Sequence, residues 1–122
     1  NMKSKFYYSD GTTSSKRDYS KVLHREDGPA IEYISGTKSW YINGKLHRED
    51  GPAIECSNGS KRWFIKYKLH RANGPAIEWS NGSVEYCLND IKYSKEEYHK
   101  LIKDYSENQY YYSEGNYYKT SL

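Results

Sequence analysis

Three histidine–arginine pairs are the side chains in this sequence with the clearest capacity for binding chemistry. They recur every 23 residues, as His24–Arg25, His47–Arg48 and His70–Arg71. In a stacked repeat protein, equivalent residues of successive units form a line. Arginine forks bind phosphate groups, and the neighbouring Asp-Gly-Pro turns could add backbone donors, so this line could bind a small anionic ligand such as a nucleotide.

A structural role is the alternative for the same pairs. Each histidine and arginine would then hydrogen-bond the acidic residue and the turn carbonyls two or three positions further on, and so shape the Asp27-Gly28-Pro29 bend and its copies. We favour this role, although the replacement of Asp50 by Asn73 in the third unit fits either one.

The histidines offer little for catalysis or metal binding. A nucleophile would need a Ser or Cys beside one of them, and a motif that repeats in every unit favours a scaffold over a single active site. Three histidines 23 residues apart also lack the short ligand spacing of zinc sites. We therefore predict a non-enzymatic protein with no catalytic residue, no metal site and no cofactor.

The pairs belong to a repeated decapeptide. The stretch from Leu23 to Glu32 recurs identically from Leu46 to Glu55, and a third copy from Leu69 to Glu78 differs at two positions only. This period of 23 residues predicts a repeat architecture. The units are residues 24–46, 47–69 and 70–92.

Each unit has the turn residues of a β-hairpin at fixed positions. Gly-Pro begins it, and a central Ser-Gly or Asn-Gly accepts the positive φ of a tight turn. A two-residue loop there predicts a buried aliphatic–aromatic face with the cross-strand pairs Ile31–Trp40, Ile54–Trp63 and Ile77–Tyr86. The opposite face would pair Glu32–Ser39, Glu55–Arg62 and Glu78–Glu85. Because one such hairpin is marginally stable alone, the units must stack.

The ends of the chain predict capping elements. Residues 5–23 look like a degenerate N-terminal hairpin. Ser94 and Glu97 form a capping-box pattern that predicts a helix over about 95–106, and residues 108–121 look like a tyrosine-rich hairpin that turns near Gly115. The predicted fold is mainly β, with stacked antiparallel β-hairpin repeats, a short C-terminal helix and a terminal hairpin in a single domain of residues 2–122.

Aromatic residues form a second candidate surface. Tyr41, Phe64 and Cys87 line up on the face expected to be the outer one. A strand that is apolar on both faces is covered on both, so either the C-terminal segment folds over this row or the row binds a partner. The tyrosines of the terminal hairpin, including the candidates Tyr111 and Tyr117, alternate onto both of its faces, so at least one row should be exposed or contact another chain. Tyrosine suits such contacts because it gives a large area with little entropy loss.

Composition narrows the partners and the compartment. The net charge of +3 comes from 19 basic and 16 acidic residues that are interleaved, so we do not expect nucleic-acid binding. Two cysteines without C-x-x-C spacing favour a reducing compartment. No apolar run approaches a membrane span and the N-terminus lacks a signal-peptide core, so we expect a cytoplasmic protein with no membrane partner.

The motif His-Arg-Glu-Asp-Gly-Pro-Ala, followed by Asn-Gly, Trp-Tyr, Asn-Gly-Lys and finally Tyr-Ser-Lys-Glu-Glu-Tyr, resembles the MORN-like repeat proteins of phages, giant viruses and some bacteria. The resemblance covers about residues 22–100. It implies a curved sheet of successive hairpins and an interaction role, but no activity. The chain departs from the standard MORN pattern of Tyr-x-Gly with a downstream Gly-x-Gly, so the lipid binding suggested for some MORN proteins is not carried over.

The function predicted from these features is a binding or scaffold module for protein–protein interaction. The partner would be another protein, or a second copy of this chain in a homo-oligomer. The abundance of Lys, Asn, Ile and Tyr suits an AT-rich genome, so a viral source acting on a host component in the host cytoplasm is expected. Binding of a small anionic ligand by the His–Arg line and tyrosines is the alternative.

Overall fold

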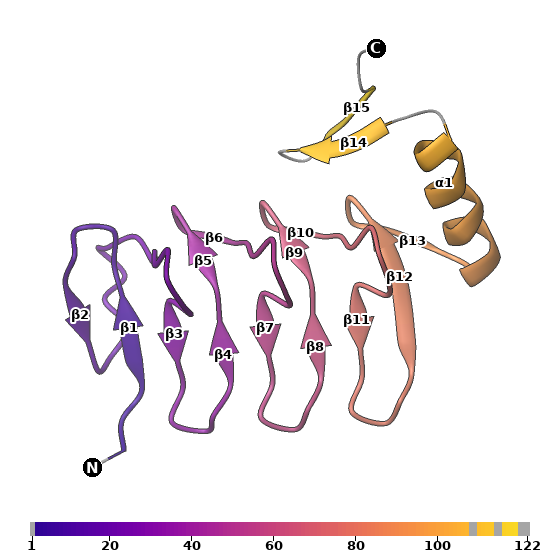
Figure 1. Cartoon of the computed structure of the whole chain (residues 1–122). Coiled ribbons are helices and arrows are strands. Elements are labelled where there is room, and N and C mark those ends of the chain that lie inside the picture. The colour runs from indigo at the N-terminus through magenta and orange to yellow at the C-terminus, as the bar shows by residue number, and fades with distance from the viewer. Residues whose placement is uncertain (1, 108–109, 114–115, 120–122) are drawn as a thin grey trace.

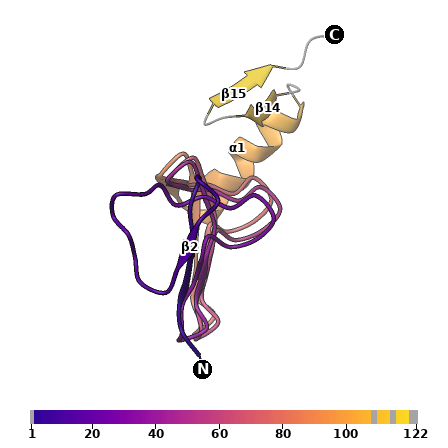
Figure 2. The ribbon, with the colours of Figure 1, turned by 90° about the vertical axis from the view of Figure 1, so that its left-hand side faces the viewer.

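The repeats form a row of β-hairpins that lie side by side (Figure 1). The computed structural model describes residues 2–107, 110–113 and 116–119, with side chains as far as Lys103. Within these residues, the main sheet is antiparallel and has the order β13-β12-β11-β8-β7-β4-β3-β1-β2. Seen along the row, the three units overlie one another (Figure 2). The predicted fold of stacked antiparallel hairpins with a short C-terminal helix is confirmed.

Each unit contributes two short hairpins. The elements are β1 (Lys5–Tyr7), β2 (Thr13–Ser14), β3 (Ile31–Glu32), β4 (Lys38–Ser39), β5 (Tyr41–Ile42), β6 (Lys45–Leu46), β7 (Ile54–Glu55), β8 (Lys61–Arg62), β9 (Phe64–Ile65), β10 (Lys68–Leu69), β11 (Ile77–Glu78), β12 (Val84–Leu88), β13 (Ile91–Tyr93), α1 (Lys95–Glu107), β14 (Tyr110–Ser113) and β15 (Asn116–Lys119). In the first unit, β3 pairs with β4 in the main sheet, and β5 pairs with β6 beyond it. The second unit repeats this order, whereas in the third the longer β12 pairs with both β11 and β13, which join the main sheet.

The turn between β3 and β4 is longer than the sequence predicts. The Tyr33 N–H donates to the Thr37 carbonyl at 2.9 Å, and Gly36 has a φ of 98°. This leaves a three-residue loop with a left-handed glycine at its end, a common hairpin connection. Ile31 therefore lies opposite Ser39, and the predicted pairing with Trp40 is wrong.

The same one-residue shift occurs in every unit. Ile54 lies opposite Arg62 and Ile77 opposite Glu85, so the predicted pairs with Trp63 and Tyr86 are also wrong. The predicted like-charge pair between Glu78 and Glu85 does not form either, because Glu78 faces Val84. Instead, opposite charges alternate across the sheet in the order Lys5, Glu32, Lys38, Glu55, Lys61 and Glu78. Such cross-strand pairs stabilise a sheet where like charges would weaken it.

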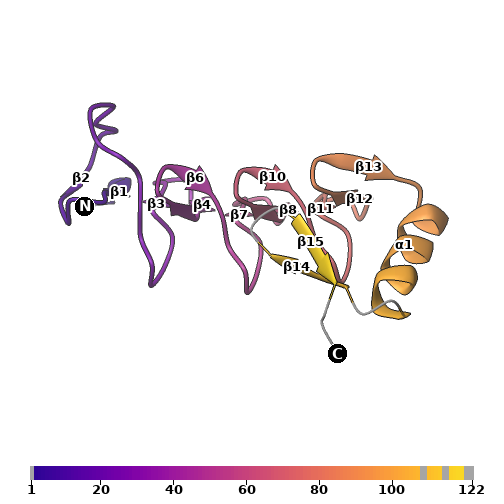
Figure 3. The same ribbon diagram turned by 90° about the horizontal axis from the view of Figure 1, so that it is seen from above.

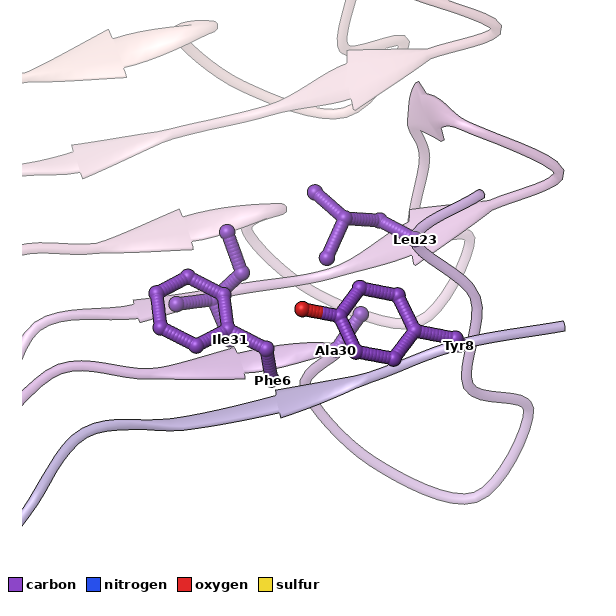
Figure 4. Close-up of a cluster of buried hydrophobic side chains, with 5 residues drawn as sticks. All are labelled: Phe6, Tyr8, Leu23, Ala30 and Ile31. Carbon is purple, nitrogen blue, oxygen red and sulfur yellow. The ribbon is translucent and has the colours of Figure 1, made fainter. Parts of the chain in front are cut away.

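The shift turns the side chains of the second strand of each hairpin to the other face, because side chains alternate along a strand. Ile31 stays on the buried face as predicted, and Ser39 replaces Trp40 opposite it. Tyr41, expected on the outer face, packs against a buried cluster, and Cys87 is 3% exposed. That cluster consists of Phe6, Tyr8, Leu23, Ala30 and Ile31 (Figure 4).

The second hairpin of each unit closes with a two-residue turn of the mirror-image type. Asn43 and Gly44 have φ values of 49° and 81°. The second unit places Lys66 and Tyr67 at the same positions, with φ values of 46° and 72°. Asparagine and glycine suit this turn, whereas lysine and tyrosine adopt its left-handed backbone at a cost.

Capping elements flank the repeats. The N-terminal hairpin pairs β1 with β2, and β1 continues the sheet beside β3. At the other end, the Glu97 N–H donates to Ser94 Oγ at 3.1 Å and the Ser94 N–H donates to Glu97 Oε1 at 3.3 Å. This confirms the predicted capping box, and the helix begins at Lys95 as expected.

The terminal hairpin pairs β14 with β15 in antiparallel register. Its predicted turn at Gly115 lies outside the described residues. The strands include Tyr111 and Tyr117, but the contacts of these side chains lie outside the part of the chain whose side chains are described. Whether they cover the sheet therefore stays a prediction.

Candidate functional site

Three connecting loops carry the repeated motif. They are residues 24–30, 47–53 and 70–76, which lead into β3, β7 and β11. Seen from above, the three loops project in a row from one side of the sheet (Figure 3). The candidate His–Arg pairs therefore do form a line, as the repeat predicts.

Each arginine is held by its own loop. Arg48 Nε donates to Asp50 Oδ1 at 3.1 Å, and Arg48 Nη1 donates to the Pro52 carbonyl at 3.0 Å. The same nitrogen donates to Glu55 Oε2 at 3.0 Å. Arg25 and Arg71 repeat all three bonds, with distances between 2.9 and 3.3 Å. In the third unit Asn73 takes the place of the aspartate, so this bond does not need a full charge.

The arginine is also stacked between an aromatic ring and a glycine. The guanidinium carbon of Arg48 lies 3.8 Å from the centroid of the Trp40 ring, which belongs to the preceding unit. On its other side, a Cβ added to Gly51 would meet Arg48 Cζ at 2.9 Å, closer than real Cβ contacts come. A side chain at this position would therefore have to displace the guanidinium group from its place on the ring, and that stack joins one unit to the next. The equivalent stacks join Arg25 to Tyr7 and Arg71 to Trp63.

Each histidine holds the two-residue turn of its own unit. His24 Nδ1 accepts the Asn43 N–H at 2.9 Å, and His47 Nδ1 accepts the Lys66 N–H at the same distance. His70 repeats the contact with Asn89 at 3.1 Å. Because Nδ1 accepts a backbone hydrogen bond, the ring nitrogen that carries the proton is Nε2. The bonded group is a turn N–H, where the sequence suggested carbonyls.

His70 differs from its two counterparts in its surroundings. It is 3% exposed, and burial lowers its pKa to about 4. It is therefore neutral at pH 7. In contrast, His24 Nε2 and His47 Nε2 lie 3.5 and 3.6 Å from the carboxylates of Glu26 and Glu49. The arginine contacts are those that the structural role predicts, whereas the histidines hold a different turn from the predicted one.

Two grooves lie between successive connecting loops. The first, of about 750 Å³, separates the loops of the first two units and is lined at its base by Trp40 and Ile42. The second, of about 770 Å³, separates the next two loops above Trp63 and Ile65. The described structure thus presents the same hollow twice, one repeat apart.

Carboxylates dominate the rim of the first groove. Glu26, Asp27, Glu49 and Asp50 line it together with two arginines, and their side chains are 83–89% exposed. Four carboxylates against two guanidinium groups make this groove acidic. The second groove is lined by Glu49 and Asp50 together with two arginines, so it is close to neutral. Reasoning from the sequence singled out the arginines and missed the acidic rim, although the repeated Glu-Asp was the signal.

The remaining candidate residues lie elsewhere. Tyr41 and Phe64 are half-buried on the face that carries the hydrophobic cluster, opposite Leu46 and Leu69. Burial raises the pKa of the Cys87 thiol, which stays protonated. These positions pack the sheet and are not joined to the grooves.

Among the residues that the structure describes, no group of three or more His, Cys, Asp and Glu side chains could hold a metal ion. Nor does any helix in that part of the chain have the length and apolar character needed to cross a membrane. Compared with protein-family models, with curated proteins and with solved structures, the chain shows no match.

Proposed function

We propose that this protein is a non-enzymatic interaction module of the MORN-like kind, which binds a protein partner along its row of connecting loops. The observation that carries the proposal is the recurrence of one groove between successive loops. A surface that repeats at a fixed interval suits an extended segment of chain, because such a segment can place successive side chains in successive grooves.

The charge of the first groove favours a basic segment. The exposed carboxylates of Glu26 and Glu49 lie at the rim, and each lies near the ring nitrogen of a histidine, at 3.5 and 3.6 Å. Lysine or arginine side chains of a partner would complement them and would steer the encounter. We therefore expect a partner with interleaved basic residues.

The same geometry weighs against the anionic ligand. Nε and Nη1 of Arg25, Arg48 and Arg71 already donate to the protein's own carboxylates, amide or carbonyls. A phosphate would have to displace those bonds and would meet the acidic rim. The neutral His70 adds no positive charge at pH 7.

A matched pair of variants tests the proposal. Glu49→Gln removes one charge shared by both grooves, and Glu96→Gln removes one exposed charge from α1. Fluorescence anisotropy with a labelled decalysine peptide at low salt should show binding that Glu49→Gln weakens by about 2- to 5-fold, the value of one exposed charge pair. Glu96→Gln should leave it within about 1.5-fold.

Two results would contradict this. Equal effects of the two variants would mean that the grooves do not hold the peptide. Tight binding of ATP, lost on charge reversal at Arg25 or Arg48, would favour the anionic ligand instead.

A further inference from the structure

The C-terminal end of the row shows what a connecting loop can bind. Tyr86 is the counterpart of Trp40 and Trp63, but no fourth arginine follows to stack on it. Instead α1 places Tyr98 there, with its ring centroid 4.7 Å from that of Tyr86. Tyr98 is the most deeply buried large side chain of the described residues, at 2% exposure.

The hydroxyl group of Tyr98 is bound by the backbone of the third connecting loop. It donates to the Arg71 carbonyl at 2.6 Å and accepts the Gly74 N–H at 3.1 Å. Burial raises the pKa of Tyr98, so the hydroxyl keeps the proton that it donates. The loop therefore provides one donor and one acceptor, which match the two roles of a phenol.

The first two loops hold the same two backbone groups. The Arg25 carbonyl and Gly28 N–H, and likewise the Arg48 carbonyl and Gly51 N–H, belong to loops with the same arginine bonds as the third. In the described part of the chain these four groups make no hydrogen bond to another residue. Their residues line the two grooves. The two backbone groups that bind Tyr98 thus recur in the first two loops, in residues that line the grooves.

We propose that each groove binds a tyrosine side chain of the partner, with its hydroxyl between the glycine N–H and the arginine carbonyl, as in Tyr98. This inference rests on the proposed function and names the side chain that the module recognises. Because Glu26, Asp27, Glu49 and Asp50 line the first groove, the tyrosine that it binds is flanked by lysine or arginine. In the grooves Arg48 and Arg71 already cover the indole rings, so the incoming ring packs beside a guanidinium group.

Amide resonances of the glycines test the inference directly. The probe is the capped peptide Lys-Tyr-Lys, titrated into the full chain labelled with ¹⁵N-glycine. Gly28 and Gly51 should both shift, because their N–H groups gain an acceptor, and Gly28 should shift at the lower peptide concentration, because its groove is acidic and that of Gly51 is close to neutral. Gly74 should not move, because its N–H already donates to Tyr98.

Two control peptides separate the contributions. Lys-Phe-Lys lacks the hydroxyl and should bind about 3- to 10-fold more weakly, the usual effect of one or two hydrogen bonds. Glu-Tyr-Glu keeps the phenol and should bind at least tenfold more weakly than Lys-Phe-Lys, because the acidic rim of the first groove repels its carboxylates. The Tyr98→Phe variant identifies the Gly74 resonance and shows the shift that follows when the hydroxyl is lost.

Four outcomes would overturn the inference. Equal binding of Lys-Tyr-Lys and Lys-Phe-Lys would exclude recognition of the hydroxyl. A shift of Gly74 as large as those of Gly28 and Gly51 would show that the glycines report a general change. If decalysine binds but the two glycines stay still, the tyrosine site fails while the proposed function stands; if neither peptide binds, both fail.

Discussion

Replacement of Arg48 tests whether the repeated arginines hold the units together. The side chain is 22% exposed, stacks on Trp40 and donates to the Pro52 carbonyl. A charged hydrogen bond of this kind contributes about 1.5–3 kcal/mol, and a partly buried cation–π contact about 1–2 kcal/mol. The ion pair with Asp50 adds little, because that carboxylate is 89% exposed. We therefore expect Arg48→Ala to lower the free energy of unfolding by about 3–5 kcal/mol.

Arg48→Lys separates geometry from charge. Lysine keeps the positive charge and the aliphatic stem but cannot reproduce the fork that joins the carbonyl to the carboxylates. We expect it to recover less than half of the loss. Urea unfolding, followed by tryptophan fluorescence and by far-ultraviolet circular dichroism, measures both variants, and Trp40 reports directly on the stack.

The third unit supplies the matched controls. Ala72 and Asn73 stand where the second unit has Glu49 and Asp50. Glu49→Ala and Asp50→Asn should thus change the free energy of unfolding by less than about 0.5 kcal/mol. If Arg48→Lys were as stable as the unaltered chain, or Asp50→Asn as costly as Arg48→Ala, the arginine would act through its charge and the stack would be unimportant.

Three further changes test other parts of the structure. Burial holds the pKa of His70 at about 4, below the 6.5 of the unfolded chain, so the contribution of His70 to stability is complete above pH 6.5 and falls by up to about 3 kcal/mol toward pH 4. Urea midpoints at pH 7 and 4.5 should show a smaller fall for His70→Gln than for the unaltered chain. An equal fall would mean that His70 does not cause the pH dependence. Ser94→Ala removes the N-cap of α1 and should speed amide hydrogen exchange in its first turns, for a loss of about 1 kcal/mol; unchanged exchange would mean that the cap contributes nothing. Lys66→Asn relieves the backbone strain of a lysine in the left-handed region and should raise the melting temperature by a few degrees, for a gain of up to about 1 kcal/mol. Asn43→Lys introduces the same strain and should lower the melting temperature. A rise with both variants would exclude backbone strain as the cause.

The sequence by itself determined the repeat fold and the residue at which the C-terminal helix begins. An exact 23-residue repeat with turn residues at fixed offsets allows little other than stacked hairpins, and Ser94 with Glu97 marks where the helix begins. These features are local, because each depends on residues a few positions apart. They were therefore readable without coordinates.

Only the tertiary structure decided the register and the faces. A central Asn-Gly fits a two-residue loop and also the end of a three-residue loop, and the hydrogen bond between Tyr33 and Thr37 selects the second. The sequence likewise predicted arginine bonds within the loop but not the bond of Arg48 to Glu55 or its stack on Trp40, because Glu55 follows Arg48 by seven residues and Trp40 belongs to another unit. The hydrogen bond from the Gly74 N–H to the Tyr98 hydroxyl joins residues that are 24 positions apart, at the C-terminal end of the stack. Contacts of this kind depend on how the units pack, and no local pattern of residue types determines them.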